Sequence, residues 1–434
     1  MEVRVRPGRS LRGEARVPGD KSIAHRALIL AALAEGDSEV HGFDPLDDCL
    51  RTLEALRACG VSIEMTSPGM LRIAGRGRDG LQEPAGTLYC GLSGTTMRLL
   101  AGVLAGLPFT ATLDGDPPLR RRPMDRVVEP LRRMGARVEA ADAGHAPLII
   151  CGGGLHGIDY ALPVASAQVK SAILLAGINA QGETVIREPA PSRDHTERML
   201  RWLGVPVEGD NGAIRLVGGT RWRGRAFALP GDISAAAFLL VAASIVQGSE
   251  VRVGAVGLNP TRSAVIEVLR GMGADVTILP TRRGADVDGP EPTADLLVRP
   301  AALHAVTLGG ALIPNLIDEL PVLAVAATQA HGETVVRDAS ELRVKESDRI
   351  AAVAEELGAM GGRIKALADG FVVEGPTRLR GATVDAHGDH RMAMALAVAG
   401  LVADGETVIR GAETVTKSFP GFFDTLQALG AEVA

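Results

Sequence analysis

Six stretches of this chain repeat one pattern of polar and apolar positions. Each stretch opens with a polar turn, continues with a run of small apolar residues, and closes with a glycine. In the first stretch, Asp20 and Ser22 flank Lys21, and the apolar run ends at Gly36. Because Asp and Ser are common at helix starts and Gly at helix stops, each stretch predicts a helix. The other five polar turns lie at residues 90–98, 166–170, 230–232, 317–319 and 387–391.

A second, amphipathic helix is predicted in every repeat, after a short run that is typical of a β-strand. Two or three further strands rich in Val, Ile and Arg complete the repeat. The first helix of each repeat is apolar on nearly every face, which predicts burial inside a domain with the half-polar strands outside. The amphipathic helices are predicted at residues 50–60, 127–135, 196–204, 264–273, 348–361 and 422–430.

The ends of the chain indicate how the repeats divide into domains. The sixth repeat stops at Ala434 without its closing strands, and residues 11–20 resemble the segments 222–232 and 379–389. We therefore expect the N-terminal segment to fold with the C-terminal half. The predicted domains are residues 1–19 plus 232–434 and residues 20–231, and a length of 434 residues suits two domains.

Composition and charge exclude several classes of protein. A net charge of −6 argues against nucleic acid as a partner. The apolar runs 235–246 and 392–403 are shorter than the roughly 18 residues of a membrane span, and the N-terminus alternates like a strand rather than a signal peptide. A cytoplasmic protein without a membrane partner is expected. Four scattered cysteines indicate neither a disulfide framework nor a zinc site, and His387 with His390 is too small a set to predict a metal.

The polar turns differ in chemistry, although the helices after them are alike. Cations dominate the turns, with a few carboxylates among them, and this mixture suits multiply anionic substrates and acid–base catalysis. Only five of the 46 basic residues are lysines, and four of them lie in these turns or in nearby loops: Lys21, Lys170, Lys345 and Lys417. Helix N-termini also favour bound anions. The repeats alone would also suit a non-catalytic, six-unit clamp-like ring protein.

The motifs of this chain, taken together, resemble those of the 5-enolpyruvylshikimate-3-phosphate (EPSP) synthase family of the shikimate pathway. The resemblance covers all six repeats. Two positions depart from the family pattern: Leu92 stands where Asn is common, and Leu99 where some members have Pro. The matching motifs are 18–22 with 25–26, 122–123, 166–168, 343–349, 389–392 and 417–420.

The resemblance implies an α/β (α+β) fold of two domains, each of three pseudo-repeated βαβαββ units with buried helices and outer sheets. The active site would lie in the interdomain cleft. The implied enzyme is a transferase that moves the enolpyruvyl group of phosphoenolpyruvate to the 5-hydroxyl of shikimate 3-phosphate and releases phosphate, in aromatic amino acid biosynthesis. It needs no cofactor or metal, is a monomer, and is inhibited by glyphosate at the phosphoenolpyruvate site.

The resemblance also implies a role for individual residues. Asp318 would take the hydroxyl proton, Glu346 would deliver or remove the proton at C3, and Lys21 would complete the catalytic group. Residues expected to bind shikimate 3-phosphate are Lys21, Ser22, Arg26, Ser166, Ala167 (through its backbone), Gln168, Ser192, Asp318 and Lys345. Residues expected to bind phosphoenolpyruvate are Lys21, Gly94, Arg122, Gln168, Arg349, Arg391 and Lys417.

The alternative enzyme is the sister enolpyruvyl transferase that acts on UDP-N-acetylglucosamine. That family typically has a Cys in the loop before the Arg-Pro pair and an Asn after the first Lys. Here residues 114–123 contain no Cys, and Lys21 is followed by Ser22. The sequence therefore favours shikimate 3-phosphate as the acceptor.

Overall fold

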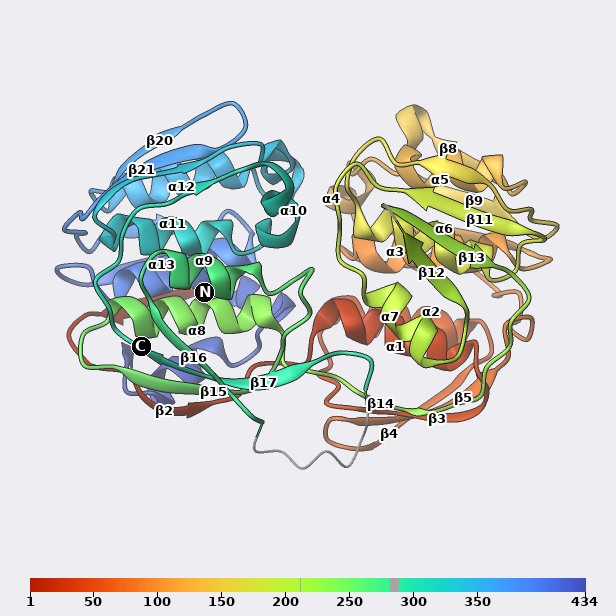
Figure 1. Cartoon of the computed structure of the whole chain (residues 1–434), viewed down its shortest axis with the longest axis horizontal. Helices are drawn as coiled ribbons and strands as arrows, with labels where there is room; N and C mark the ends of the chain where they lie inside the picture. The colour runs from red at the N-terminus through yellow and green to blue at the C-terminus, as the bar shows by residue number, and fades with distance from the viewer. Residues whose placement is uncertain (211, 282–288) are drawn as a thin grey trace. The chain divides into compact units, whose positions relative to one another are not determined.

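The computed structural model describes residues 1–210, 212–281 and 289–434 (Figure 1). The chain forms two compact units. The N-half unit comprises Gly19–Leu229 and residues 289–291, and the C-half unit comprises Met1–Pro18, residues 230–281 and Pro292–Ala434. The domain boundaries predicted from the sequence differ from these by one or two residues at each crossing. Residues 289–291 are the larger difference, because the prediction assigned them to the other domain.

A side-chain contact explains this difference. Nδ1 of His195 lies 2.7 Å from Oε1 of Glu291, and both side chains are about fully buried. His195 begins helix α7 of the N-half unit, so this ion pair ties residues 289–291 to that unit. The sequence pattern carries no signal of the pairing.

Three buried helices form the centre of each unit, as the apolar pattern predicted. Nearly every residue of these helices is buried. In the N-half unit they are α1 (Lys21–Ala32), α3 (Gly94–Ala105) and α6 (Ala167–Gly177). In the C-half unit they are α8 (Ile233–Ile245), α11 (Leu320–Gln329) and α13 (His390–Gly400), which lie together inside the unit (Figure 1).

The amphipathic helices lie within a few residues of their predicted positions. They are α2 (Asp47–Ala58), α5 (Asp125–Arg133), α7 (His195–Trp202), α9 (Ala264–Gly271), α12 (Arg349–Ala359) and α14 (Phe422–Ala428). Two four-residue helices, α4 (Pro117–Arg120) and α10 (Ile313–Leu316), precede the second and fifth of them.

Within the described residues, the strands form six four-stranded sheets of one design. In each sheet the first two strands pair in parallel, and the remaining strands pair antiparallel. The sheets of the N-half unit are β14 (Ala226–Ala228), β3 (Glu35–His41), β5 (Met70–Arg76), β4 (Ser62–Ser67); β6 (Leu88–Tyr89), β7 (Thr110–Asp114), β9 (His145–Cys151), β8 (Arg137–Ala141); and β10 (Asp159–Ala161), β11 (Glu183–Arg187), β13 (Ala213–Val217), β12 (Val207–Asp210).

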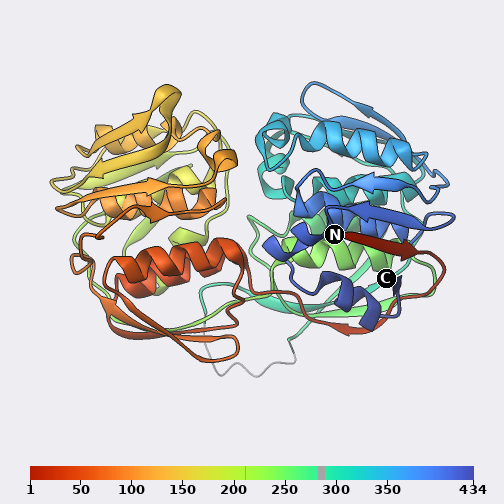
Figure 2. The ribbon, with the colours of Figure 1, turned by 180° about the vertical axis from the view of Figure 1, so that it is seen from behind.

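The C-half unit repeats this design with strands from both ends of the chain. β1 lies between β23 and β24 and pairs antiparallel with both, and Figure 2 shows it beside the C-terminal segments. The sheets are β2 (Arg12–Ala15), β15 (Glu250–Gly257), β17 (Thr293–Arg299), β16 (Asp275–Leu279); β18 (Thr307–Leu308), β19 (Gly332–Val336), β21 (Phe371–Gly375), β20 (Arg363–Ala366); and β22 (Thr383–Asp385), β23 (Thr407–Arg410), β1 (Glu2–Arg6), β24 (Glu432–Val433).

The polar turns cap the central helices, as their composition predicted. Asp20, Ser93, Ser166, Asp232 and Asp389 each accept a hydrogen bond from a backbone N–H in the first turn of the helix that follows. These caps orient the polar turns, so the chemistry-bearing residues of each unit gather at helix N-termini.

Membrane spans were sought among the described residues. No single helix there is long and apolar enough to cross a membrane. One bent pair, Gly310–Leu316 with Leu320–Gln329, reaches the required length and composition only when its two parts are added together.

Candidate active site

Arg349 is the centre of the polar cluster in the C-half unit. It is the first residue of α12, and its side chain is 1% exposed. Its Nε donates to Oδ2 of Asp389 at 2.7 Å, and its Nη2 donates to Oε2 of Glu346 at 2.8 Å. Its Nη1 donates to Oδ1 of Asp318 at 3.2 Å. One guanidinium therefore holds three carboxylates at once, a geometry that only the planar fork of Arg allows.

The charges of this cluster stabilise one another. Burial works against the charge on Arg349, but the carboxylates of Asp389, Glu346 and Asp318 raise the pKa of its guanidinium. Burial likewise opposes the charge on Asp389, yet Arg349 holds the pKa of that carboxyl below its ordinary value. The buried pair therefore stays ionised and gives the unit a fixed positive group beside two more exposed carboxylates.

Asp318 lies among three guanidinium groups. Besides Arg349, Nε of Arg391 lies 3.5 Å from Oδ1 of Asp318, and Nη1 of Arg262 lies 3.8 Å from Oδ2. Arg262 is itself buried and donates to Oδ1 of Asp232, the cap of α8. Asp318 stands between α10 and α11, at a helix N-terminus, so a base at this position is well placed beside anions that the same cations attract.

Two lysines complete the predicted set of the C-half unit. Lys417 ends a short 3₁₀ turn (Ala412–Lys417), and its Nζ donates to the carbonyl oxygen of Gly388 at 2.9 Å. Lys345 directly precedes Glu346 and is half-buried. The structure thus gathers the predicted residues Asp318, Glu346, Arg349 and Arg391 by direct contact, and Lys417 adjoins the turn that leads into Arg391.

In the N-half unit, Lys21 and Arg26 have different surroundings. Nζ of Lys21 donates to Oδ2 of Asp48 at 2.9 Å, and both side chains are about one-fifth exposed. Arg26 is buried and donates to the carbonyl oxygen of Ser22, to Oγ of Ser171 and to Oγ1 of Thr196. Burial lowers the pKa of Arg26 to about 10. Arg26 therefore joins α1 to α6 and α7, and its remaining two N–H groups are what it could offer a ligand.

Gly94 lies beside two arginines at the start of α3. A methyl group placed on Gly94 would lie 3.1 Å from Nη1 of Arg122 and 3.1 Å from Nη1 of Arg98. Arg98 also donates to Oε1 of Gln168 and to the carbonyl oxygen of Pro123. The predicted residues Gly94, Arg122 and Gln168 thus surround Arg98. The sequence assignments omitted Arg98, although its position one helical turn after Gly94 was the signal that could have found it.

Ser192 is held by a buried ionic group. Its Oγ donates to Glu188, and its carbonyl oxygen accepts from Nζ of Lys170 at 3.2 Å. Lys170 is 1% exposed and also contacts Oε2 of Glu188 at 2.9 Å and Oε1 of Glu197 at 2.7 Å. Burial raises the pKa of Glu197. Lys170, which the sequence singled out, therefore anchors the loop of Ser192 rather than facing outward.

The remaining two predicted residues lie at one helix N-terminus. Ser166 caps α6 and accepts from the backbone N–H of Val169 at 3.4 Å, and Ala167 is the first residue of that helix. Gln168 follows and donates through Nε2 to Oγ1 of Thr95 at 2.8 Å. This contact links the N-termini of α6 and α3 within the unit.

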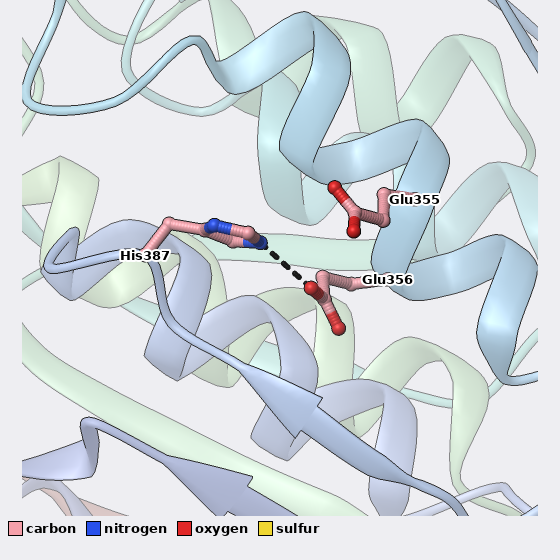
Figure 3. A group of neighbouring side chains, drawn as sticks. All are labelled: Glu355, Glu356 and His387. Carbon is pink, nitrogen blue, oxygen red and sulfur yellow. Dashed lines mark hydrogen bonds and ion pairs between the residues drawn. The ribbon is translucent and has the colours of Figure 1, made fainter.

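Among the described residues, one group offers three potential metal ligands. It consists of Glu355, Glu356 and His387, whose ligand atoms lie within 4.8 Å of one another (Figure 3). His390 is buried elsewhere, with Nδ1 3.9 Å from Oδ1 of Asp389. The pair His387 and His390 that the sequence brought to attention therefore does not form one group.

Comparison with known proteins adds independent findings. The family model of EPSP synthase (3-phosphoshikimate 1-carboxyvinyltransferase) matches residues 5–426. A 3-phosphoshikimate 1-carboxyvinyltransferase of Desulforamulus reducens is 50% identical over 433 residues, which cover 100% of both chains. One of Halorhodospira halophila is 54% identical over 431 residues, covering 99% of this chain and 96% of that protein. A solved structure of EPSP synthase from Acinetobacter baumannii is similar with a TM-score of 0.89 at 45% identity, covering 100% of this chain and 99% of the other.

Proposed function

Since this chain belongs to the EPSP synthase family, we propose that it is the transferase that the relatives' names describe. It transfers the enolpyruvyl group of phosphoenolpyruvate to the 5-hydroxyl of shikimate 3-phosphate and releases phosphate. The observation that carries this proposal is the contact of one guanidinium, that of Arg349, with both Asp318 and Glu346. The two carboxylates proposed for proton transfer are thereby held beside a fixed positive charge.

The reaction is an addition followed by an elimination. In the addition, Glu346 donates a proton to C3 of the enol, and the hydroxyl oxygen attacks C2 while Asp318 accepts the hydroxyl proton. In the elimination, C3 loses a proton and the bond from C2 to the phosphate oxygen breaks, which restores the double bond. General acid–base catalysis of this kind requires carboxylates within reach of the reacting atoms. The chemistry uses side chains alone, so we propose no cofactor.

The substrates are strongly anionic, which explains the number of cations. Two phosphates and two carboxylates bring a charge of about −5 to −6. We propose that both units contribute to binding, with the domain division 1–19 plus 232–434 and 20–231. Shikimate 3-phosphate is assigned to Lys21, Ser22, Arg26, Ser166, Ala167, Gln168, Ser192, Asp318 and Lys345. Phosphoenolpyruvate is assigned to Lys21, Gly94, Arg122, Gln168, Arg349, Arg391 and Lys417.

One experiment tests the activity. Phosphate release from phosphoenolpyruvate is measured with shikimate 3-phosphate as the acceptor and, separately, with UDP-N-acetylglucosamine. Release with the first acceptor only is the expected result. Release with the second acceptor alone, or with neither, would contradict the proposed function.

Three finer properties belong to the same proposal. Glyphosate should inhibit in competition with phosphoenolpyruvate, the protein should be a monomer, and its location should be the cytoplasm. The sequence resemblance supports the first two, and the strand-like N-terminal pattern supports the third. Inhibition kinetics, light scattering and cell fractionation test them in that order.

A further inference from the structure

The turn between β22 and α13, which we call the 386–389 turn, contacts three cations that the proposed function assigns to phosphoenolpyruvate. The carbonyl oxygen of Gly388 accepts from Lys417, and the carboxylate of Asp389 accepts from Arg349. Asp389 also accepts from the backbone N–H of Arg391 at 2.9 Å. The position of this turn therefore helps to set the position of all three cations.

His387 holds the turn from its other end. Its backbone is left-handed, with φ of 50°, which is uncommon for a residue other than glycine. Its Nε2 lies 2.6 Å from Oε1 of Glu356, and Figure 3 shows the ring directed at that carboxylate. A carboxylate only accepts hydrogen bonds, so the ring donates from Nε2. The second oxygen of Glu356 accepts from the backbone N–H of Asp385 at 3.0 Å.

Helix α12 supplies both anchors of the turn. Arg349 and Glu356 are seven positions apart on this helix, which is two turns, so they share one face. Arg349 contacts Asp389 at the end of the turn, and Glu356 contacts Asp385 and His387 at its start. The side chain of Glu356 is 8% exposed, so its hydrogen bonds are shielded from water.

We propose that His387 and Glu356 are positioning residues for the phosphoenolpyruvate site. Their hydrogen bond fixes the 386–389 turn on α12 and thereby preorganises Lys417 and Arg391 for an anion. This inference rests on the proposed function, because that function assigns these cations to phosphoenolpyruvate. Neither positioning residue contacts substrate in this scheme.

The test compares three variants with the wild type. His387→Gly removes the ring and suits the left-handed backbone, whereas His387→Ala removes the ring and leaves the backbone strained. Glu356→Gln removes the charge of the acceptor. Glu355→Gln is the matched control, because it makes the same change at the neighbouring, exposed residue.

We expect both His387 variants to raise the KM for phosphoenolpyruvate roughly tenfold, the effect expected when about one charged hydrogen bond of preorganisation is lost. Glu356→Gln should raise it in the same direction, and Glu355→Gln should leave it unchanged. The kcat and the KM for shikimate 3-phosphate should stay within about twofold in all four variants, because the change concerns only the anion site. The Tm of His387→Ala should be lower than that of His387→Gly, while their KM values agree.

Several outcomes would overturn the proposal. One is an unchanged KM for phosphoenolpyruvate in His387→Gly, and another is a KM that follows Tm across the variants, since that indicates a purely structural role. A third is a rise in the wild-type KM after treatment with EDTA, because a metal bridge would then hold the turn. Phosphate release by the wild type is measured first, so a failure of the proposed function is recognised separately.

Discussion

Nη1 of Arg349 lies 3.2 Å from Oδ1 of Asp318, and the same guanidinium donates to Glu346. The planar fork fixes the direction of both contacts, so the relative position of the two carboxylates depends on one buried side chain. Asp389 in turn fixes the guanidinium from behind through Nε. The cluster therefore presents two proton-transfer groups on a rigid support.

The first prediction concerns these two carboxylates. Asp318→Asn and Glu346→Gln should each keep substrate binding within a few-fold and lower kcat by at least about 10²-fold, because each removes one general acid or base. Steady-state phosphate release and calorimetric binding measure the two quantities. Glu374→Gln, at an exposed carboxylate of the same unit, is the control. A variant with turnover near that of the wild type would show that its carboxylate has another role.

The second prediction concerns the guanidinium. Arg349→Lys keeps the positive charge but cannot contact three carboxylates at once, so turnover should fall by at least about 10²-fold and the C-half unit should lose about 2 kcal/mol of stability. Circular dichroism reports unfolding of the whole chain. Both tryptophans, Trp202 and Trp222, lie in the N-half unit, so their fluorescence midpoint should stay unchanged. Full activity in Arg349→Lys would mean that the fork geometry is unimportant.

The third prediction concerns Gly94. The added methyl of Gly94→Ala would meet the guanidinium ends of Arg98 and Arg122 at 3.1 Å, so these groups must shift by a few tenths of an ångström. Glyphosate is slightly longer than phosphoenolpyruvate and should tolerate this shift less. The inhibition constant of glyphosate should rise by a larger factor than the KM for phosphoenolpyruvate, with a difference on the order of 10²-fold.

A matched control is available for this glycine. A methyl group on Gly86 would meet no atom within 4 Å, so Gly86→Ala should change neither constant. Steady-state inhibition of the three proteins decides the point. Equal factors for inhibitor and substrate in Gly94→Ala would show that Gly94 does not line the anion site.

The fourth prediction concerns the pH dependence of stability. His25 is fully buried, with Nδ1 2.7 Å from Oγ1 of Thr52, and burial lowers the pKa of its ring to about 3. The unfolded chain binds a proton at His25 near pH 6.5, whereas the folded chain does not, so stability falls as the pH drops below that value. Between about pH 7.5 and about pH 5 the loss should be about 2 kcal/mol.

His25→Gln provides the comparison, since its side chain stays neutral over this range. Urea unfolding followed by tryptophan fluorescence reports on the N-half unit, which contains His25. The wild type should lose more stability than the variant as the pH falls. Parallel pH profiles for the two proteins would contradict a buried, neutral ring.

Much of the fold follows from local sequence. Caps such as Asp20 and Ser93, together with helical spacing of apolar residues, located both helices of each repeat to within a few residues. The missing strands after Ala434 correctly indicated that the N-terminal segment pairs with the last repeat. These features depend on neighbouring residues, which a sequence pattern records.

The partners within the site depend instead on tertiary placement. The sequence marked Lys170 as an exposed candidate, but the fold buries it between Glu188 and Glu197. It gave no sign that Arg262 approaches Asp318 or that Glu291 reaches His195, because each pair is joined only by packing of distant segments. Charge and spacing therefore identified most candidate residues but not their contacts.

The position of β1 between β23 and β24 sets an order of events during synthesis. Arg6 bonds to Glu432, which the ribosome adds 426 residues later. At roughly 5–20 residues per second, β1 waits on the order of half a minute for its partner strands. Throughout that interval its backbone N–H and C=O groups are unpaired, which makes a nascent strand prone to join another chain. The alternation of arginine with valine along β1 places charges at every second position, and such charges protect a strand that emerges first and pairs last.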